Sequence, residues 1–155
     1  MSENKQNKTA DIIPSNIHYR EYLDTDLKYV QSLMNELGYS VAEEDLSANI
    51  KEIQQRDGVI YVAEFDNRLI ACICSMVDAR LAEGVYGEIV SLIVSEKSRG
   101  VGVGSSLVRL CEKWLSKRVG KMRVRANEVR SKAHSFYTTL GYKEVKTQKV
   151  FIKKI

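Results

Sequence analysis

A glycine-rich segment between an apolar run and an amphipathic helix is the feature that most limits how this chain can fold. Residues 89–94 are apolar enough for a strand buried on both faces, and residues 99–104 follow with glycine at every second position. Behind them apolar side chains recur at helical spacing, at Leu107, Leu110, Cys111, Trp114 and Leu115. Strand, glycine loop and helix start together can bind a phosphate group, because free main-chain N–H groups and the helix dipole both favour an anion there.

Two widespread phosphate-binding motifs are excluded by the residues around this loop. A Walker loop needs a lysine directly after its last glycine, but Ser105 and Ser106 follow Gly104. A dinucleotide-binding fingerprint that starts at Gly100 and Gly102 needs a third glycine at position 105, which is serine. The glycines alone therefore leave two interpretations open, a phosphate loop of another type or a tight turn.

Hydrophobic periodicity and turn signals predict one α/β domain over residues 15–155. Strands are expected near 17–22, 59–65, 69–77, 86–94, 121–126, 142–146 and 148–153, and helices near 27–37, 43–56, 107–115 and 131–140. This order predicts a central mixed, twisted sheet of six to seven strands flanked by about four helices. Residues 1–14 are polar and lack periodicity, which predicts a disordered tail.

The small net charge of the chain, +4, conceals an uneven distribution of charged residues. Residues 116–155 contain twelve basic and two acidic side chains, whereas the residues before them carry an acidic excess. A basic stretch favours an anionic ligand such as a nucleotide or nucleic acid, although a solvated surface explains the same pattern. Tyr142 and Phe151, the aromatic residues interleaved with that charge, are too few for a platform on which bases stack, which argues against nucleic acid as the partner.

The three cysteines, Cys72, Cys74 and Cys111, cannot all pair, and they form no Cys-x-x-Cys array. Their pattern favours a reducing compartment and gives no sign of a disulfide framework or a zinc site. No apolar run approaches the roughly 20 residues that a membrane-spanning helix needs, and residues 1–11 lack the apolar core of a signal peptide. We therefore expect a cytoplasmic protein that binds neither a metal nor a membrane.

Three sequence motifs occur in a fixed order along the chain. Arg99-x-x-Gly102-x-Gly104 matches the pattern [Arg/Gln]-x-x-Gly-x-[Gly/Ala], residues 88–94 form the strand before it, and the segment near the C-terminus reads Ala133-x-x-Phe136-Tyr137-x-x-x-Gly141-Tyr142. All three resemble motifs of the GNAT superfamily of N-acetyltransferases, and the resemblance covers residues 17–155. It implies a GNAT-like α/β fold and an enzyme that moves the acetyl group of acetyl-coenzyme A to an amine without a metal.

The resemblance also implies how acetyl-coenzyme A is bound. Its diphosphate is expected on the main-chain N–H groups of Arg99, Gly100, Val101, Gly102, Val103 and Gly104, with Ser105 nearby. Its pantetheine arm is expected beside the main chain of Leu92, Ile93 and Val94. The family often carries an asparagine three residues before the alanine of the last motif, where this chain has Arg130. Asn127 is the candidate to replace that asparagine's contact with the coenzyme.

Glu88 and Tyr137 are the residues to which the resemblance gives catalytic roles. Glu88 is the candidate base that takes a proton from the amine, and Tyr137 is the candidate acid that protonates the leaving thiolate. Each has a simpler interpretation, Glu88 as an exposed strand residue in a surface ion pair and Tyr137 as a core residue of its helix. A lone helical histidine such as His134 is more often structural, and Cys111 lies among core positions.

The segment between the first two helices is expected to form one wall of the acceptor pocket. It contains Tyr39 and the acidic run 43–45, which predicts a cationic primary amine such as an aminoglycoside, a polyamine or a lysine-bearing peptide. The alternative function is a regulatory domain that binds acyl-coenzyme A without catalysis. The resemblance leaves open whether the chain forms a homodimer through its C-terminal strands.

Overall fold

The computed structural model describes residues 16–155, and the predicted disordered tail of residues 1–14 lies outside this range. A five-stranded sheet has the order β1-β2-β3-β4-β5, with antiparallel neighbours except for the parallel pair β4 and β5. The strands are β1 (His18–Glu21), β2 (Gly58–Phe65), β3 (Arg68–Arg80), β4 (Gly84–Val94) and β5 (Met122–Val124). The α-helices of the described residues are α1 (Leu27–Glu36), α2 (Glu43–Gln55), α3 (Val103–Leu115) and α4 (Ser131–Thr139). The predicted α/β domain with a mixed sheet and four helices is confirmed.

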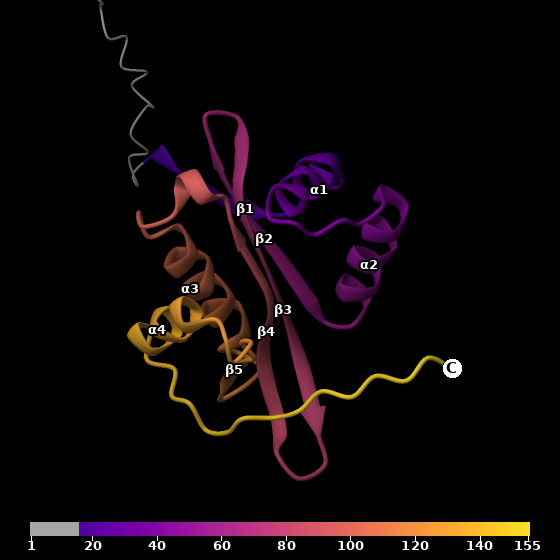
Figure 1. Ribbon diagram of the computed structural model, residues 1–155, viewed down its shortest axis with the longest axis vertical. Helices are drawn as coiled ribbons and strands as arrows, with labels where there is room; N and C mark the ends of the chain where they lie inside the picture. Colours follow the sequence, from indigo (N-terminus) through magenta and orange to yellow (C-terminus); the bar gives the residue numbers. More distant parts are fainter. Residues whose placement is uncertain (1–15) are drawn as a thin grey trace, which may run out of the picture.

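Helices cover both faces of the sheet (Figure 1). Successive side chains of a strand point to opposite faces, so neighbouring residues enter different cores. Val62 and Cys72 pack with side chains of α1 and α2, whereas Ile73 and Ile89 pack with side chains of α3. The two apolar clusters hold the sheet between two helical layers.

α3 joins the sheet through a stripe of side chains at helical spacing. Leu107, Cys111 and Leu115 are fully buried, which confirms the prediction that Cys111 is a core residue. Truncating a side chain such as Leu107 to alanine would cost about 2–5 kcal/mol of the free energy of unfolding. At 9 to 13 residues, none of the described helices is long and apolar enough to cross a membrane.

The prediction of six to seven strands is wrong at the C-terminal end of the chain. Residues 143–155 form no regular structure, and Figure 1 shows them as an extended segment leading away from α4. Val145, Val150 and Phe151 are each more than four-fifths exposed. An alternating sequence becomes a strand only beside a partner that takes up its main-chain hydrogen bonds. No strand of residues 16–155 lies along this segment, so the sheet ends at β5.

Candidate active site

β4 and β5 run side by side for a short distance and then part. Their parallel pairing joins Gly87, Glu88 and Ile89 to residues 122–124, but β4 continues to Val94 and stays paired with β3 on its other side. Beyond Ile89, no strand in the described part of the chain takes up the main-chain groups that β4 presents toward β5. An unpaired strand edge can accept an extended chain with matching donors and acceptors. The predicted pantetheine residues, 92–94, lie on this edge.

A β-bulge opens β4 at the point where β5 ends. The register of β3 and β4 shifts at Ser75, which lies opposite Ile89, and Val90 is left as an extra residue of β4. The buried Ser75 hydroxyl donates a hydrogen bond of 2.8 Å to the main-chain oxygen of Glu88. Because a bulge bends its strand and turns the nearby side chains, Val90 is half-exposed although Glu88 and Ile89 before it are buried.

The glycine-rich loop leads into α3 with a left-handed backbone. Gly100 and Gly102 have φ angles of 81° and 88°, and Gly102 is the N-cap of α3. The Ser106 N–H donates the first hydrogen bond of the helix, 3.0 Å to the Gly102 oxygen. None of the main-chain N–H groups of residues 100–105 has an acceptor within residues 16–155. Six consecutive free donors at a helix start fit the diphosphate group of a nucleotide ligand.

Arg99 and Gly104 shape the two ends of this loop. The Arg99 Nε–H donates 3.2 Å to the Val94 oxygen and its main-chain N–H donates 3.4 Å to the Glu96 oxygen, so Arg99 ties the loop to the end of β4. A Cβ on Gly104 would lie only 3.2 Å from the ring of Phe136, and glycine therefore lets α4 approach the start of α3. Arg99 alone among the predicted diphosphate residues has its N–H group engaged within the chain.

Tyr137 lies on α4 within a cluster of aromatic rings. Its ring is edge-on to Phe136 and Tyr142, at 5.0 and 5.7 Å between centroids. Burial raises the pKa of Tyr137 above its ordinary value, and the nearby charge of Arg130 acts in the opposite direction. The phenol is therefore protonated at neutral pH, as a proton donor must be. The same ring packs against the α3 side of the core.

Asn127 and His134 organise the loop between β5 and α4. The Asn127 Oδ1 accepts a hydrogen bond of 3.2 Å from the Val129 N–H. The Asn127 main-chain oxygen accepts from the Arg130 N–H at 3.0 Å and lies 2.8 Å from the His134 Nε2. This contact supports the interpretation of His134 as a structural residue. Asn127 is exposed, and its contact with the coenzyme stays a prediction.

Glu88 is buried, with 7% of its surface exposed, and two arginines enclose its carboxylate. Arg123 Nη2 lies 2.6 Å from Oε2, and Arg125 Nε lies 3.1 Å from Oε1. The simpler interpretation of an exposed strand residue is wrong, because β5 and the segment after it cover this part of β4. The same interpretation also predicted that Glu88 forms an ion pair, and Glu88 does so with Arg123 and Arg125. The role of Glu88 as a base stays a prediction.

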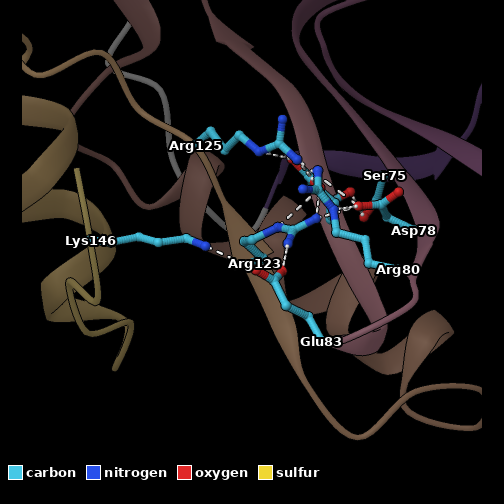
Figure 2. A network of polar contacts seen from close by, with 8 residues as sticks. Ser75, Asp78, Arg80, Glu83, Arg123, Arg125 and Lys146 are labelled. Atoms are coloured by element: carbon cyan, nitrogen blue, oxygen red, sulfur yellow. Dashed lines mark hydrogen bonds and ion pairs between the residues drawn. The ribbon is translucent and has the colours of Figure 1, made fainter. Parts of the chain in front are cut away.

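Arg123 contacts three carboxylates at once and was not singled out from the sequence. Its Nε and Nη2 donate to Glu88, its Nη2 also donates to Asp78, and its Nη1 lies 3.1 Å from Glu83 (Figure 2). Basic residues alternate at 121, 123 and 125, a pattern that is typical of one charged face of a strand but names no partner for it. The acidic partners lie 35 to 45 residues earlier in the chain, so only the folded sheet brings them together.

A pocket of about 300 Å³ is lined by Glu88 and its neighbours. Its apolar lining consists of Met76, Val77 and Val90. Its charged lining consists of Asp78, Arg80, Glu88 and Arg125. The acidic run 43–45 is not part of this lining and lies exposed in the first turn of α2, and the exposed Tyr39 does not line the pocket either.

The fold and these features together define a class of protein. It is a single-domain α/β protein with a glycine-rich loop of free N–H groups before α3, and beside that loop the strands β4 and β5 part after Ile89. A sequence model of the acetyltransferase (GNAT) family matches residues 25–142. The chain belongs to this family, and the predictions of a GNAT-like fold and of an acetyltransferase are confirmed. No curated protein sequence matches the chain significantly.

Solved structures of N-acetyltransferases share this fold at low sequence identity. An aminoglycoside 6'-N-acetyltransferase from Acinetobacter haemolyticus is 20% identical, with 89% of this chain and 99% of that chain covered and a TM-score of 0.77. The aminoglycoside N-acetyltransferase AAC(6')-Iy, solved in complex with coenzyme A, is 18% identical over 89% of this chain and 100% of that one, with a TM-score of 0.75. Glucosamine-6-phosphate N-acetyltransferase from Arabidopsis thaliana is 20% identical over 89% and 99%, with a TM-score of 0.74.

Proposed function

We propose that this chain transfers the acetyl group of acetyl-coenzyme A to a primary amine, which attacks directly within a ternary complex. The observation that supports the proposal most is the unpaired edge of β4 next to the six free N–H groups of residues 100–105. An extended ligand with a diphosphate at one end matches both features, since a strand edge binds amide groups and a helix start binds phosphate. AAC(6')-Iy, a protein of the same fold, binds coenzyme A.

The reaction requires that the amine be held beside the thioester, and it requires two proton transfers. Acetyl-coenzyme A supplies an activated thioester, so the chain's main contribution is to hold the amine in place. Glu88 takes the proton that the ammonium group loses, and the C–N bond forms as the C–S bond breaks. Tyr137 donates its hydroxyl proton to the departing sulfur. Main-chain N–H groups near Ile93 stabilise the negative charge that develops on the carbonyl oxygen.

The acceptor is a primary amine, and its finer class remains a prediction. The acidic run 43–45 predicted a polycation, but this run lies outside the pocket beside Glu88. Two proteins of the same fold are named for amino-sugar substrates, an aminoglycoside and glucosamine 6-phosphate. Aminoglycosides, polyamines and lysine peptides therefore belong in the acceptor screen beside amino-sugar phosphates.

Release of free thiol from acetyl-coenzyme A on addition of amines tests the proposed activity. Calorimetry with coenzyme A alone tests binding separately. Binding heat together with thiol release supports an N-acetyltransferase, whereas binding heat with no thiol release from any amine favours the regulatory alternative. The proposal is wrong if coenzyme A gives neither binding heat nor a thermal shift.

Glu88→Gln tests the proposed base without changing the shape of the side chain. We expect kcat/KM for the amine to fall by about 100-fold or more, because general base catalysis is typically worth that factor. Glu52→Gln on the exposed face of α2, where Glu52 pairs with Arg56, is the matched control and should keep full activity. Glu88 is not the base if Glu88→Gln retains the parent kcat/KM from about pH 6 to about pH 9.

A homodimer is part of the same proposal, and the C-terminal segment supports it. The main chain of residues 143–155 makes no hydrogen bond within the described chain, and Val150, Phe151 and Ile152 are exposed together. A second copy of the chain can pair with this main chain and cover these apolar side chains. Two-fold symmetry lets each copy cover the C-terminal segment of the other. Sedimentation should show a dimer that a chain ending at Thr147 fails to form. A full-length chain that stays monomeric at every concentration contradicts this part of the proposal.

A cytoplasmic location also belongs to the proposal. Cys72, Cys74 and Cys111 are free and buried, a state that suits a reducing compartment. Fractionation of cells that express the chain would test the location directly.

A further inference from the structure

Charged side chains around the pocket beside Glu88 form one connected network (Figure 2). Three carboxylates take part, those of Asp78, Glu83 and Glu88. Glu83 and Glu88 each contact two cationic groups, and Asp78 contacts three. The four cations are Arg80, Arg123, Arg125 and Lys146. The network therefore holds one positive charge more than its carboxylates neutralise. A polycation would find no unpaired carboxylate here.

Unused hydrogen-bond donors remain on Arg80, Arg125 and Lys146, and only the two arginines among them line the pocket. Arg123 is 16% exposed and uses all three of its nitrogens on the carboxylates. Arg80 contacts Asp78 through Nε at 2.9 Å, and Arg125 contacts Glu88 through Nε at 3.1 Å and Nη2 at 3.5 Å. Both Nη atoms of Arg80 and the Nη1 of Arg125 have no acceptor within residues 16–155. These two side chains are 40% and 52% exposed.

Arg80 and Arg125 both line the pocket that also contains Glu88. A guanidinium group binds a carboxylate or phosphate through a planar fork of N–H donors, and such charge-assisted bonds are among the strongest in proteins. We propose that the amine acceptor carries an anionic group, a carboxylate or a phosphate, which Arg80 and Arg125 bind while Glu88 receives the amine. This inference rests on the proposed function and names the acceptor class for the same pocket.

The two arginines that contact the Glu88 carboxylate differ in distance and in exposure. Arg123 approaches to 2.6 Å and is nearly buried, whereas Arg125 stays at 3.1 Å and is half-exposed. An anion on the acceptor draws the Arg125 guanidinium away from Oε1, and the ammonium group of the same acceptor takes its place there. Arg123 keeps Oε2 in position throughout. One ion pair opens and three form, those of the anion with Arg80 and Arg125 and that of the ammonium group with Glu88. An amine without an anion forms only the last of these.

Pairs of amines that differ only in the anion test this acceptor class. Lysine differs from cadaverine by one carboxylate, and glucosamine 6-phosphate differs from glucosamine by one phosphate. We expect the anionic member of at least one pair to have a kcat/KM about tenfold higher, measured by thiol release. The two pairs distinguish a carboxylate from a phosphate. Equal values in both pairs, or preference for cadaverine and glucosamine, overturn the inference.

Variants of the two arginines show whether they carry the preference. Arg125→Gln and Arg80→Gln should each reduce the anionic-to-neutral ratio of kcat/KM, mainly by raising KM for the anionic acceptor. Arg56→Gln removes an exposed arginine from the end of α2 and should keep the parent ratio. If Arg125→Gln fails to fold, judged by its thermal transition, Arg80→Gln still decides the question. An unchanged ratio in every folded pocket variant overturns the inference.

Calorimetry separates a failure of this inference from a failure of the proposed function. Each amine is titrated into the chain saturated with coenzyme A, so that binding is measured without turnover. Anion-dependent binding with no thiol release from any amine supports the acceptor class and contradicts the proposed activity. Thiol release with no anion-dependent binding or rate supports the activity and overturns the acceptor class. The inference is also overturned if none of the four amines binds or reacts.

Discussion

Tyr137 carries its hydroxyl on α4 beside the rings of Phe136 and Tyr142, where burial raises its pKa. A phenol with a raised pKa keeps its proton to higher pH, so the donor stays available through the neutral and mildly alkaline range. We predict that Tyr137→Phe lowers kcat by about tenfold or more. The KM for acetyl-coenzyme A should change little, because the ring remains. Steady-state thiol release measures both quantities.

Tyr142→Phe is the matched control for this change at the residue scale. The Tyr142 hydroxyl donates a hydrogen bond of 2.8 Å to Glu112 on α3, and its removal should lower the thermal transition rather than kcat. If both variants lose kcat equally, Tyr137 acts through packing of the aromatic cluster and is not the proton donor.

At the scale of elements, the loop before α3 depends on the backbone of Gly102. A Cβ at this position meets nothing within 4 Å, so only the φ of 88° opposes a side chain. A left-handed conformation costs an alanine about 1–2 kcal/mol, which disturbs the free N–H groups at the helix start. We predict that Gly102→Ala raises the Kd for coenzyme A several-fold, measured by calorimetry.

Gly120→Ala provides the control for this loop. Gly120 also has open space around its Cβ position, but its φ is not in the left-handed region. The alanine there should leave coenzyme A affinity unchanged. Equal losses of affinity in both variants would show that the conformation of Gly102 has no special part in binding.

The junction of β1 and α1 is held by an ion pair that responds to acid. Arg20 of β1 donates to the buried Asp26 carboxylate at 2.6 and 2.9 Å. Hydrogen bonds from the Arg20 guanidinium hold the pKa of Asp26 below its usual range, against the opposing effect of burial. A carboxyl whose folded pKa is lowered stabilises the fold above its unfolded pKa of about 3.9. That contribution is lost as the pH falls through the folded value.

Asp26→Asn should therefore cost about 2 kcal/mol of the free energy of unfolding at neutral pH. The pair is partly exposed on the arginine side, which keeps the loss below that of a fully buried pair. Urea unfolding at pH 7 and at pH 3 measures the effect. The gap between parent and variant should narrow in acid, and a gap that is constant with pH would assign the loss to packing instead.

At the scale of the whole molecule, local sequence patterns predicted the helices and most strands. Long-range pairing decided which strands join the sheet and which charged side chains meet at the site. Helical spacing at Leu107 and Cys111, and the glycines after β4, predicted α3 and its loop because both depend on near neighbours. The contacts of Arg123 with Glu88 and Asp78 join residues 35 and 45 positions apart, which no local pattern encodes. Residues 142–153 alternate like strands, but alternation does not supply the partner that a strand needs.

Three buried thiols make the whole fold sensitive to alkali. Burial raises the pKa of Cys72, Cys74 and Cys111 to about 12 each. In the unfolded chain a thiol has a pKa of about 8.5, so above that pH the unfolded chain releases protons that the folded chain keeps. The stabilising contribution is complete below the unfolded pKa and is lost as the pH rises toward the folded value. We predict that Tm, followed by circular dichroism under reducing conditions, falls steeply above about pH 9.

Removing one of the three thiols should make the decline of Tm with rising pH shallower. Cys72→Ala lowers Tm at pH 7 because it leaves a cavity, but one group fewer then titrates between the unfolded and folded pKa values. The slope of Tm against pH above about pH 9 should therefore be smaller than in the parent chain. Ser47→Ala on α2 leaves all three thiols in place and should keep the parent slope. A parent Tm that stays constant to about pH 10.5 would show that the buried thiols do not couple folding to pH.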